Sequence, residues 1–488
     1  MAEIEFENIW ARYGLRDSPY NVKALSLIGS FNIEDVFCGR EEELKVLGNR
    51  IHSTESSRTL IVGEIGTGKT TFANYLRWLL TRKNVKETKF LTLVDEMKVR
   101  DDWDYNKFLR ETLFEIYNSS KIFNWEAQGI KFKTLDVIKN NLDLFLTKDI
   151  GLKETEITIS NHEEKIKKDI PSELLRSWFL QLCEEIKGYN KSFIFHYNNL
   201  EAIHPEKLGA LFMSIKELIQ IPNTHWFFLG PSDILSTIEN KSQIHSIFHN
   251  HLMLEPLSED EILKILKKRC NALKDKDVNY IKPYEDDTVK ELHKKLNGNI
   301  RFIFKLLEDT TNCLSSVTCK ATIQEINAIQ EKEKRKILSR LNENQQKIIA
   351  LLIERGEMTL TELSDGVDIK PQNLQKDLRE LRGKTFIAFR DNPDDKRSKL
   401  VRLSQNTYLS FVFSQEKSVA LMEYLIKTYT NEDDLVLDNC MGSGTTGVAC
   451  KNLNRDFIGI EIDEKYFKIA KERINDALAT DSAVGDKK

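Results

Sequence analysis

The sequence predicts an α/β protein, because the order of apolar strand, glycine-rich turn and helix occurs twice and a long block of helical periodicity lies between the two occurrences. The first occurrence runs from Leu60 to Thr71, and the second from Leu435 to Ala449. The chain has 488 residues, of which 40% are hydrophobic and 30% charged. That length and balance are typical of a globular protein with about three domains.

Charge and cysteine content narrow the class of protein. The formal net charge of −4 gives no overall nucleic-acid signature, so any basic surface must be local. The seven cysteines are scattered and form no C-x-x-C pair, as expected for reduced thiols in a cytoplasmic protein. The amino terminus has no charged-then-apolar leader, and no apolar run reaches the roughly 18 residues of a membrane span. We therefore expect a cytoplasmic location and no membrane contact.

The first glycine-rich turn has the pattern G-x-x-x-x-G-K-T, and a helix-like pattern follows it. Glycines at these positions let the backbone turn tightly, so that successive N–H groups and the helix amino terminus face phosphate oxygens. Lys69 is expected to reach the β- and γ-phosphates of ATP, and Thr70 to be a ligand of Mg²⁺. The predicted ATP-binding residues of this loop are Gly63, Gly66, Thr67, Gly68, Lys69, Thr70 and Thr71.

Upstream of this loop, Gly39-Arg40-Glu41-Glu42-Glu43-Leu44 is a glycine turn before a helix with three carboxylates in its first turn. With the phosphate loop, it resembles the AAA+ ATPases of the initiator-like and signal-transduction (STAND-like) kind, over residues 8–405. The resemblance implies that this element helps to enclose adenine. It also implies a nucleotide-binding core at 1–257, a helical lid at 258–340, and an oligomer that forms on nucleotide binding.

Further strands are expected at 89–94, 192–198 and 226–230, with helices at 103–117 and 172–187. The strand at 192–198 stands where relatives have their Walker B acids, but this chain has Asn198 and Asn199 there. An amide cannot act as a general base and is a weaker partner for hydrated Mg²⁺ than a carboxylate. We expect ATP binding with slow or absent hydrolysis, at most a weak ATPase, unless Glu201 substitutes for the missing acids.

Two more residues are candidates for phosphate contacts through the same resemblance. Ser232 follows the strand at 226–230, where the family has a polar sensor, and Arg301 in Gly298-Asn299-Ile300-Arg301 resembles the second sensor, although it also fits a surface helix residue. Ser258 with Glu261 forms a capping-box pattern that opens the lid. No arginine finger is evident between 236 and 251.

Residues 341–405 read as three helices followed by a hairpin, which together make a winged helix. Pro371 suits the first turn of the third helix, and the span 370–402 has ten Lys and Arg against five Asp and Glu. Such a module either contacts duplex DNA or docks on protein. The predicted DNA-binding residues are Gln372, Asn373, Gln375, Lys376, Arg379, Arg397 and Lys399.

The second glycine-rich turn lies in Asp438-Asn439-Cys440-Met441-Gly442-Ser443-Gly444-Thr445-Thr446-Gly447, and a strand ending in Glu461 follows. A glycine turn with an acid about 20 residues later is typical of dinucleotide-type binding. The longer run resembles the S-adenosylmethionine motif of amino-methylating (adenine-N6 or cytosine-N4) DNA methyltransferases, over residues 414–478. The resemblance implies that Asp438, Gly442, Gly444 and Glu461 bind the cofactor.

The catalytic D/N/S-P-P-Y/F/W loop of those enzymes occurs nowhere in the chain. Three interpretations of the fragment therefore stay open. It is a relic that docks passively on the ATPase, a cofactor-sensing or partner-binding module, or half of a methyltransferase that a complementary chain completes. We expect a nucleotide-switch ATPase in genome defence or DNA-associated regulation, with a DNA methyltransferase as the alternative.

Overall fold

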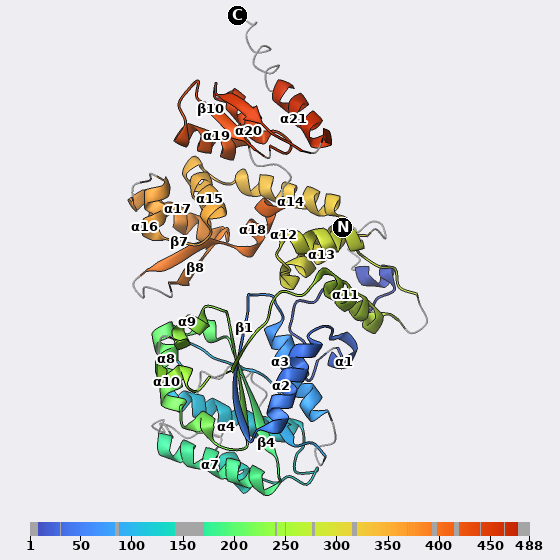
Figure 1. The fold of residues 1–488 in the computed structure, drawn as a ribbon, viewed down its shortest axis with the longest axis vertical. Coiled ribbons are helices and arrows are strands. Elements are labelled where there is room, and N and C mark those ends of the chain that lie inside the picture. Colours follow the sequence, from blue (N-terminus) through green and yellow to red (C-terminus); the bar gives the residue numbers. More distant parts are fainter. Residues whose placement is uncertain are drawn as a thin grey trace, which may run out of the picture. The chain divides into compact units, whose positions relative to one another are not determined.

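The computed structural model describes residues 8–29, 31–82, 87–141, 170–239, 242–248, 250–275, 279–314, 320–367, 369, 371–392, 398–413, 419–439, 441–462 and 464–476. The chain divides into two compact units, Met1–Ala321 and Thr322–Lys488 (Figure 1). In the part of the chain that the structure describes, no helix combines the length and apolar character needed to cross a membrane.

The first unit is built on a parallel sheet with the strand order β2-β4-β5-β1-β6, and β3 pairs with the end of β4. The strands are β1 Ser56–Val62, β2 Phe90–Thr92, β3 Met97–Lys98, β4 Ser192–Asn198, β5 Thr224–Gly230 and β6 Asn250–Met253. The strands predicted around 89–94, 192–198 and 226–230 are thus present. Because β1 lies between β5 and β6, the phosphate loop leaves the sheet from an interior position.

Helices cover both faces of this sheet, as in other parallel sheets (Figure 1). Alternation along the strands supplies both cores: Phe193, Phe195 and Trp226 face one side, whereas Ile194 and Phe227 face the other. The helical elements before the lid are η1 Ile9–Tyr13, α1 Ile33–Val36, α2 Glu41–Ser53, α3 Lys69–Thr81, α4 Tyr105–Ile122, α5 Lys133–Lys139, α7 Ser172–Gly188, η2 Leu200–Ala202, α8 Pro205–Ile215, η3 Leu218–Gln220, α9 Ile234–Glu239 and α10 Ser242–His245.

Three helices complete the first unit: α11 Glu259–Leu273, α12 Asp286–Lys295 and α13 Ile300–Cys313. The predicted capping box at the start of α11 is confirmed, because the side chains of Ser258 and Glu261 each accept from the other residue's backbone N–H. The division between the units falls at Ala321, whereas the sequence-based lid runs to residue 340. Helix α14 (Ile323–Leu338) packs on α18 (Gln405–Val412) in the second unit, where Ser410 Oγ donates to Gln330 Oε1 at 3.2 Å.

The middle of the second unit contains the elements predicted there, three helices and a hairpin. Strands β7, β9 and β8 form an antiparallel sheet in that order. Helix α17 begins at Pro371, as predicted, and an apolar cluster that includes Ile348, Leu363, Leu378 and Val401 joins the helices to the sheet. The elements are α15 Glu343–Arg355, β7 Met358–Thr359, α16 Leu360–Val367, α17 Pro371–Gly383, β8 Ile387–Asp391 and β9 Lys399–Leu403.

The end of the second unit is a small α/β element with two parallel strands, β10 and β11. Its elements are α19 Val419–Tyr429, β10 Leu435–Asp438, α20 Thr445–Asn452, β11 Asp456–Gly459 and α21 Glu464–Asp476. The predicted fold class is therefore confirmed: an α/β chain in which a phosphate-loop domain with a helical region precedes a small helix-and-hairpin module and a small unit with two parallel strands.

Candidate functional site

The phosphate loop has the tight geometry that its glycines predict. Gly66 and Gly68 have φ values of 91° and 87°, in the left-handed region that favours glycine. A Cβ on Gly68 would meet no heavy atom within 4 Å, so the backbone in front of α3 stays open to a ligand. Lys69 is the first residue of α3, and its Nζ donates to the carbonyl oxygens of Gly63 at 2.7 Å and Glu64 at 2.9 Å. The ammonium group is thus held over the loop.

The loop opens into a cavity of about 280 Å³ whose lining is of two chemical kinds. One part of the lining is the loop itself, from Ile65 to Phe72, together with Asn198, Asn199, Glu201 and Arg301. The other part is mainly apolar, and it includes Leu25, Val36, Phe37, Leu257 and Phe304. A polar phosphate loop beside apolar side chains suits a nucleotide, since a base needs an apolar surface and phosphates need N–H groups and cations. From the Gly39–Leu44 element, Arg40 lines this cavity.

Burial and neighbouring charges act on Lys69. Burial lowers its pKa and Arg301 lowers it further, whereas Glu201 and Glu64 act in the opposite direction. Two cations that line the same cavity attract an anion. Arg301 therefore faces the phosphate loop, where the resemblance places the second sensor, and Glu201 lies near enough to interact with the same ammonium group.

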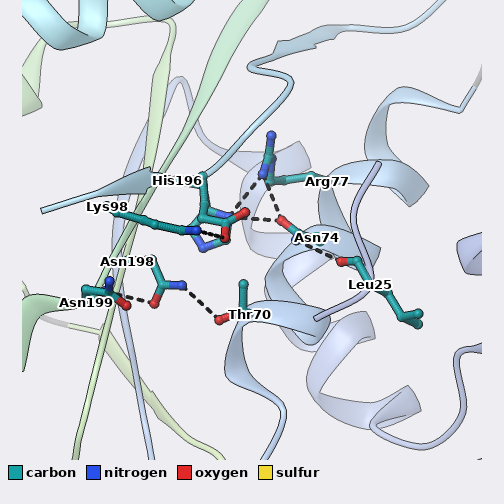
Figure 2. A network of polar contacts seen from close by, with 9 residues as sticks. Leu25, Thr70, Asn74, Arg77, Lys98, His196, Asn198 and Asn199 are labelled. Carbon is teal, nitrogen blue, oxygen red and sulfur yellow. Dashed lines mark hydrogen bonds and ion pairs between the residues drawn. The ribbon is translucent and has the colours of Figure 1, made fainter. Parts of the chain in front are cut away.

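The end of strand β4 carries amides where related ATPases have acids. Asn198 Nδ2 donates to Thr70 Oγ1 at 3.0 Å, and Asn198 Oδ1 accepts from the backbone N–H of Asn199 at 2.9 Å (Figure 2). Asn199 has a φ of 65° and starts the short turn that carries Glu201. The Asn198 side chain that contacts Thr70 is therefore neutral. The hydroxyl predicted to hold Mg²⁺ is bonded to an amide and not to a carboxylate.

Ser232 contacts the phosphate loop but does not line the cavity. Its Oγ donates to Glu64 Oε1 at 2.9 Å, and it is not among the residues that line the cavity. Thr67 Oγ1 donates to the carbonyl oxygen of Glu64 at 2.9 Å. Thr71 lines the cavity, and its Oγ1 accepts from the backbone N–H of Leu25 at 3.3 Å. Ser232 and Thr67 therefore both contact Glu64, which directly follows the first glycine of the loop.

Sequence reasoning missed the residue that joins the lid to the loop. Asn299 caps α13 by accepting from Phe302 N–H at 3.2 Å, and its Nδ2 donates to the carbonyl oxygen of Ile65 at 2.9 Å. A Cβ on Gly66 would lie 2.2 Å from Asn299 Oδ1, so only glycine leaves room for this contact. The sequence analysis considered only Arg301 in the Gly-Asn-Ile-Arg run. Asparagine is a favoured helix N-cap residue, so the position of Asn299 was a signal that this side chain has a structural role at the start of α13.

A buried polar network ties α3 to the neighbouring strands and to the amino-terminal segment (Figure 2). Arg77 is fully buried, and its guanidinium donates to Asn74 Oδ1 at 2.8 Å, to Thr92 Oγ1 at 2.8 Å and to the carbonyl oxygen of Leu93. Asn74 Nδ2 donates at 2.9 Å to the carbonyl oxygen of Leu25, a residue that lines the cavity. Burial lowers the pKa of Arg77 to about 10, which still leaves it charged at neutral pH. This network fixes the helix that carries Lys69 and Thr70.

In the helix-and-hairpin module, most of the predicted DNA-binding residues share an exposed surface. Asn373, Gln375, Lys376 and Arg379 are exposed on α17, opposite the buried Leu374, Leu378 and Leu381, and Lys399 is exposed on β9. The side chain of Gln372 and all of Arg397 lie outside the described residues. Two other basic residues of the hairpin, Arg390 and Arg402, both pair with Glu357, so their charge is partly neutralised.

In the tail, the glycine turn and the two predicted acids come together. Glu461 Oε2 accepts from the backbone N–H of Gly442 at 2.8 Å, and Asp438 Oδ2 accepts from Thr446 Oγ1 at 2.6 Å. Gly442 has a φ of 53° with open space where a Cβ would lie, whereas a Cβ on Gly444 would lie 2.8 Å from that of Ala470 on α21. The carboxylates and the open turn fit a nucleoside cofactor, and Gly444 is needed for helix packing.

The remaining candidate sites are metal-binding clusters and thiols. Within the described ranges, no group of three or more His, Cys, Asp or Glu side chains is arranged to hold a metal ion. Cys38, Cys183, Cys270, Cys313 and Cys450 are free thiols, while Cys319 and Cys440 lie outside the described residues. The reduced state predicted for the cysteines agrees with these five.

Comparison with known proteins finds the methyltransferase resemblance that the sequence predicts. Residues 258–472 match a family model described as DNA methylase. The type II methyltransferase M2.LlaDCHI of Lactococcus lactis subsp. cremoris is 48% identical over 60 residues, which are 12% of this chain and 22% of that protein. M.HpaI of Haemophilus parainfluenzae is also 48% identical over 60 residues, 12% of this chain and 19% of that protein. The chain therefore spans about a fifth of the length of the curated relatives that it matches.

Among solved structures, the Aeropyrum pernix ORC1 protein in complex with DNA matches 80% of this chain and 95% of its own, with a sequence identity of 14% and a TM-score of 0.42. The DNA is that protein's own ligand.

Proposed function

We propose that this chain is an ATP-binding nucleotide switch that hydrolyses ATP slowly. The observation that carries the proposal is the cavity that joins the phosphate loop to an apolar wall while amides occupy the end of β4. Lys69 and Arg301 supply positive charge for phosphates, and Thr70 supplies a hydroxyl for Mg²⁺. The general base of ordinary hydrolysis is missing at Asn198 and Asn199, so bound ATP would persist.

Slow hydrolysis favours a switch over a motor, because the bound state then lasts long enough to be detected by another molecule. Asn299 and Arg301 belong to α13 and its cap but meet the phosphate loop, so ATP and ADP would make different contacts with the lid. A difference in contacts between two nucleotide states is what shifts a conformational equilibrium. We place this switch in DNA-associated regulation or genome defence, by analogy with related ATPases. Nucleotide-dependent assembly into an oligomer belongs to the same proposal.

Titration calorimetry tests the binding half of the proposal. ATP with Mg²⁺ should bind the full chain, and Lys69→Ala should weaken binding at least tenfold, about 1.4 kcal/mol. Lys45→Ala is the matched control, since Lys45 is an exposed lysine on α2 and does not line the cavity. Equal affinity of the two variants would show that the loop does not hold the nucleotide.

The output of the switch is the winged helix that α15 to α17 and the hairpin form. We propose that its exposed face of Asn373, Gln375, Lys376 and Arg379 contacts duplex DNA, with docking on a protein as the competing outcome. The pairing of Arg390 and Arg402 with Glu357 partly neutralises these two hairpin arginines, so we expect Lys376 and Arg379 of α17 to carry the main phosphate contacts.

A salt titration distinguishes the two outcomes. Replacing both Lys376 and Arg379 with Ala should weaken binding to all duplex sequences and lower the slope of log K against log salt by up to about 2, because each phosphate contact contributes about 0.9. Arg335→Ala, on the exposed side of α14, is the control. An unchanged slope would favour protein docking.

A second candidate function is supported by the tail. We propose that it holds S-adenosylmethionine, with Glu461 and Asp438 beside the glycine turn, as part of a DNA methyltransferase for adenine-N6 or cytosine-N4. When bound, this cofactor supplies an electrophilic methyl group. The chain lacks the loop that would hold the target amine, so activity would require a complementary chain.

A further inference from the structure

Among the residues that the structure describes, helices cover one face of the tail's two-stranded sheet. Side chains alternate along β10 and β11, and Val436 and Phe457 pack with Ile426 and Ala449 of the helices α19 and α20. The opposite face carries Leu435, Leu437, Ile458 and Ile460, which are 59, 62, 49 and 53% exposed. We call these four residues the open face.

Parallel strands usually have helices on both faces, and a sheet of two strands is short of the size that is stable alone. In the described part of the second unit, α21 does not fill the open face, because its Ala470 and Ile474 lie against Gly444 and Gly447 at the start of α20. A contiguous exposed aliphatic surface on a parallel sheet resembles one side of a hydrophobic core whose other side is supplied by a partner.

The border of the open face is acidic. Glu432, Asp433, Asp434 and Asp456 are exposed where the two strands begin. A second copy of this chain would bring further carboxylates to this edge of the interface. A partner with an aliphatic surface flanked by lysine or arginine would be complementary in both respects.

We propose that the open face is the docking surface for a separate polypeptide that carries the rest of a methyltransferase domain. The partner lays an amphipathic helix with basic flanks over Leu435, Leu437, Ile458 and Ile460 and so completes the second layer of the sheet. The chain's span of about a fifth of its curated relatives leaves room for such a partner. This inference rests on the second candidate function. The open face is the surface to which the catalytic part of the methyltransferase domain would bind.

Co-expression with a truncated relative tests the docking. The probe is M.HpaI of Haemophilus parainfluenzae without the segment that matches this chain, produced together with the full chain. We expect the probe to be soluble and to co-purify with the chain in a one-to-one complex. The double variant Leu437→Asp, Ile458→Asp should abolish the complex, whereas the matched control Val46→Asp, at an exposed aliphatic position on α2, should keep it.

Ile460→Asp is a milder variant, placed after the end of β11, and guards against misfolding of the tail in the double variant. It should weaken the complex at least tenfold. A probe that stays insoluble or unbound with the folded wild-type chain would overturn the proposal. So would a complex that survives Ile460→Asp and the double variant, or a homodimer of the chain alone, measured by light scattering, that the double variant dissociates.

The failure of the docking and the failure of the second function are separable. Binding of S-adenosylmethionine by the chain alone, without any complex, would leave the cofactor site standing and remove the docking surface. A complex without methyl transfer to DNA would support the docking surface and remove the enzymatic function.

Discussion

Restoring an acid at the end of β4 should convert a slow ATPase into a faster one. Asn198→Asp changes one nitrogen to oxygen and keeps the shape of the side chain. In the wild type, the amide oxygen of Asn198 is 2.9 Å from the backbone nitrogen of Asn199, and its amide nitrogen is 3.0 Å from Thr70 Oγ1. In the variant, one carboxylate oxygen would still accept from the N–H of Asn199, and the other would face Thr70 Oγ1. The hydroxyl of Thr70 can rotate to donate to it, which frees lone pairs for Mg²⁺.

The second position is also open to an acid, since Asn199 has a φ of 65° and aspartate tolerates that conformation better than most residues. A positioned general base contributes about 10² to 10⁴ in rate. We expect the double variant Asn198→Asp, Asn199→Asp to hydrolyse ATP about 10²-fold faster than the wild type, by phosphate release with Mg²⁺. A rate within twofold of the wild type, with ATP affinity retained, would refute the argument that the amides limit hydrolysis. Glu201→Gln in both backgrounds then shows whether that carboxylate carries the residual rate.

Three further predictions concern other parts of the chain. Gly66→Ala places a Cβ against the lid amide in a backbone conformation that alanine resists, so it should weaken ATP binding at least tenfold in calorimetry, whereas Gly188→Ala, where a Cβ meets nothing within 4 Å, should not. Burial lowers the pKa of His225 to about 4, below its unfolded value of about 6.5, so the folded state keeps it neutral. The contribution of His225 to the free energy of unfolding is therefore complete above pH 6.5, and about 3 kcal/mol of it is lost as the pH falls toward 4. Urea unfolding should show that the free energy of unfolding falls less between pH 7.5 and pH 5 in His225→Gln than in the wild type. The isolated chain should transfer no tritiated methyl group from S-adenosylmethionine to genomic DNA, and incorporation that an Asp438→Ala, Glu461→Ala variant abolishes would reverse the ranking of the two functions.

Local patterns predicted most of the elements of this chain. The glycine spacing of the phosphate loop, the apolar runs of β4 and β5, the capping box at Ser258 and the proline at the start of α17 each depend on residues within a few positions of one another. Interactions of that range are readable from spacing because they follow from helix and turn geometry.

The contacts that the sequence did not reveal join residues far apart in the chain. Asn299 meets Ile65 across 234 positions, and Arg77 meets His196 across 119. The hairpin arginines Arg390 and Arg402, which add to the basic composition of 370–402, both pair with Glu357, which precedes the strand β7. Nothing in local periodicity specifies such pairs, since they depend on how the sheet and helices pack.

The site residues also divide into those that local motifs predict and those that depend on long-range packing. The loop residues and Asn198 lie together as the motif implies, because parallel strands end at one edge of a sheet. Ser232 was placed by resemblance and contacts Glu64. The apolar wall from the amino-terminal segment was not foreseen, because nothing in Asn21–Leu25 distinguishes a pocket lining from an ordinary loop.

Single-turnover hydrolysis, with the protein in excess over ATP and Mg²⁺ present, is the measurement that tests the central claim most directly. The account predicts that ATP is bound through the loop holding Lys69 and is recovered intact over many seconds, because amides occupy the end of β4. The fraction bound should fall in Lys69→Ala. Conversion of bound ATP to ADP faster than about 1 s⁻¹, the low end of ordinary enzyme turnover, would contradict the account and make the chain a conventional ATPase.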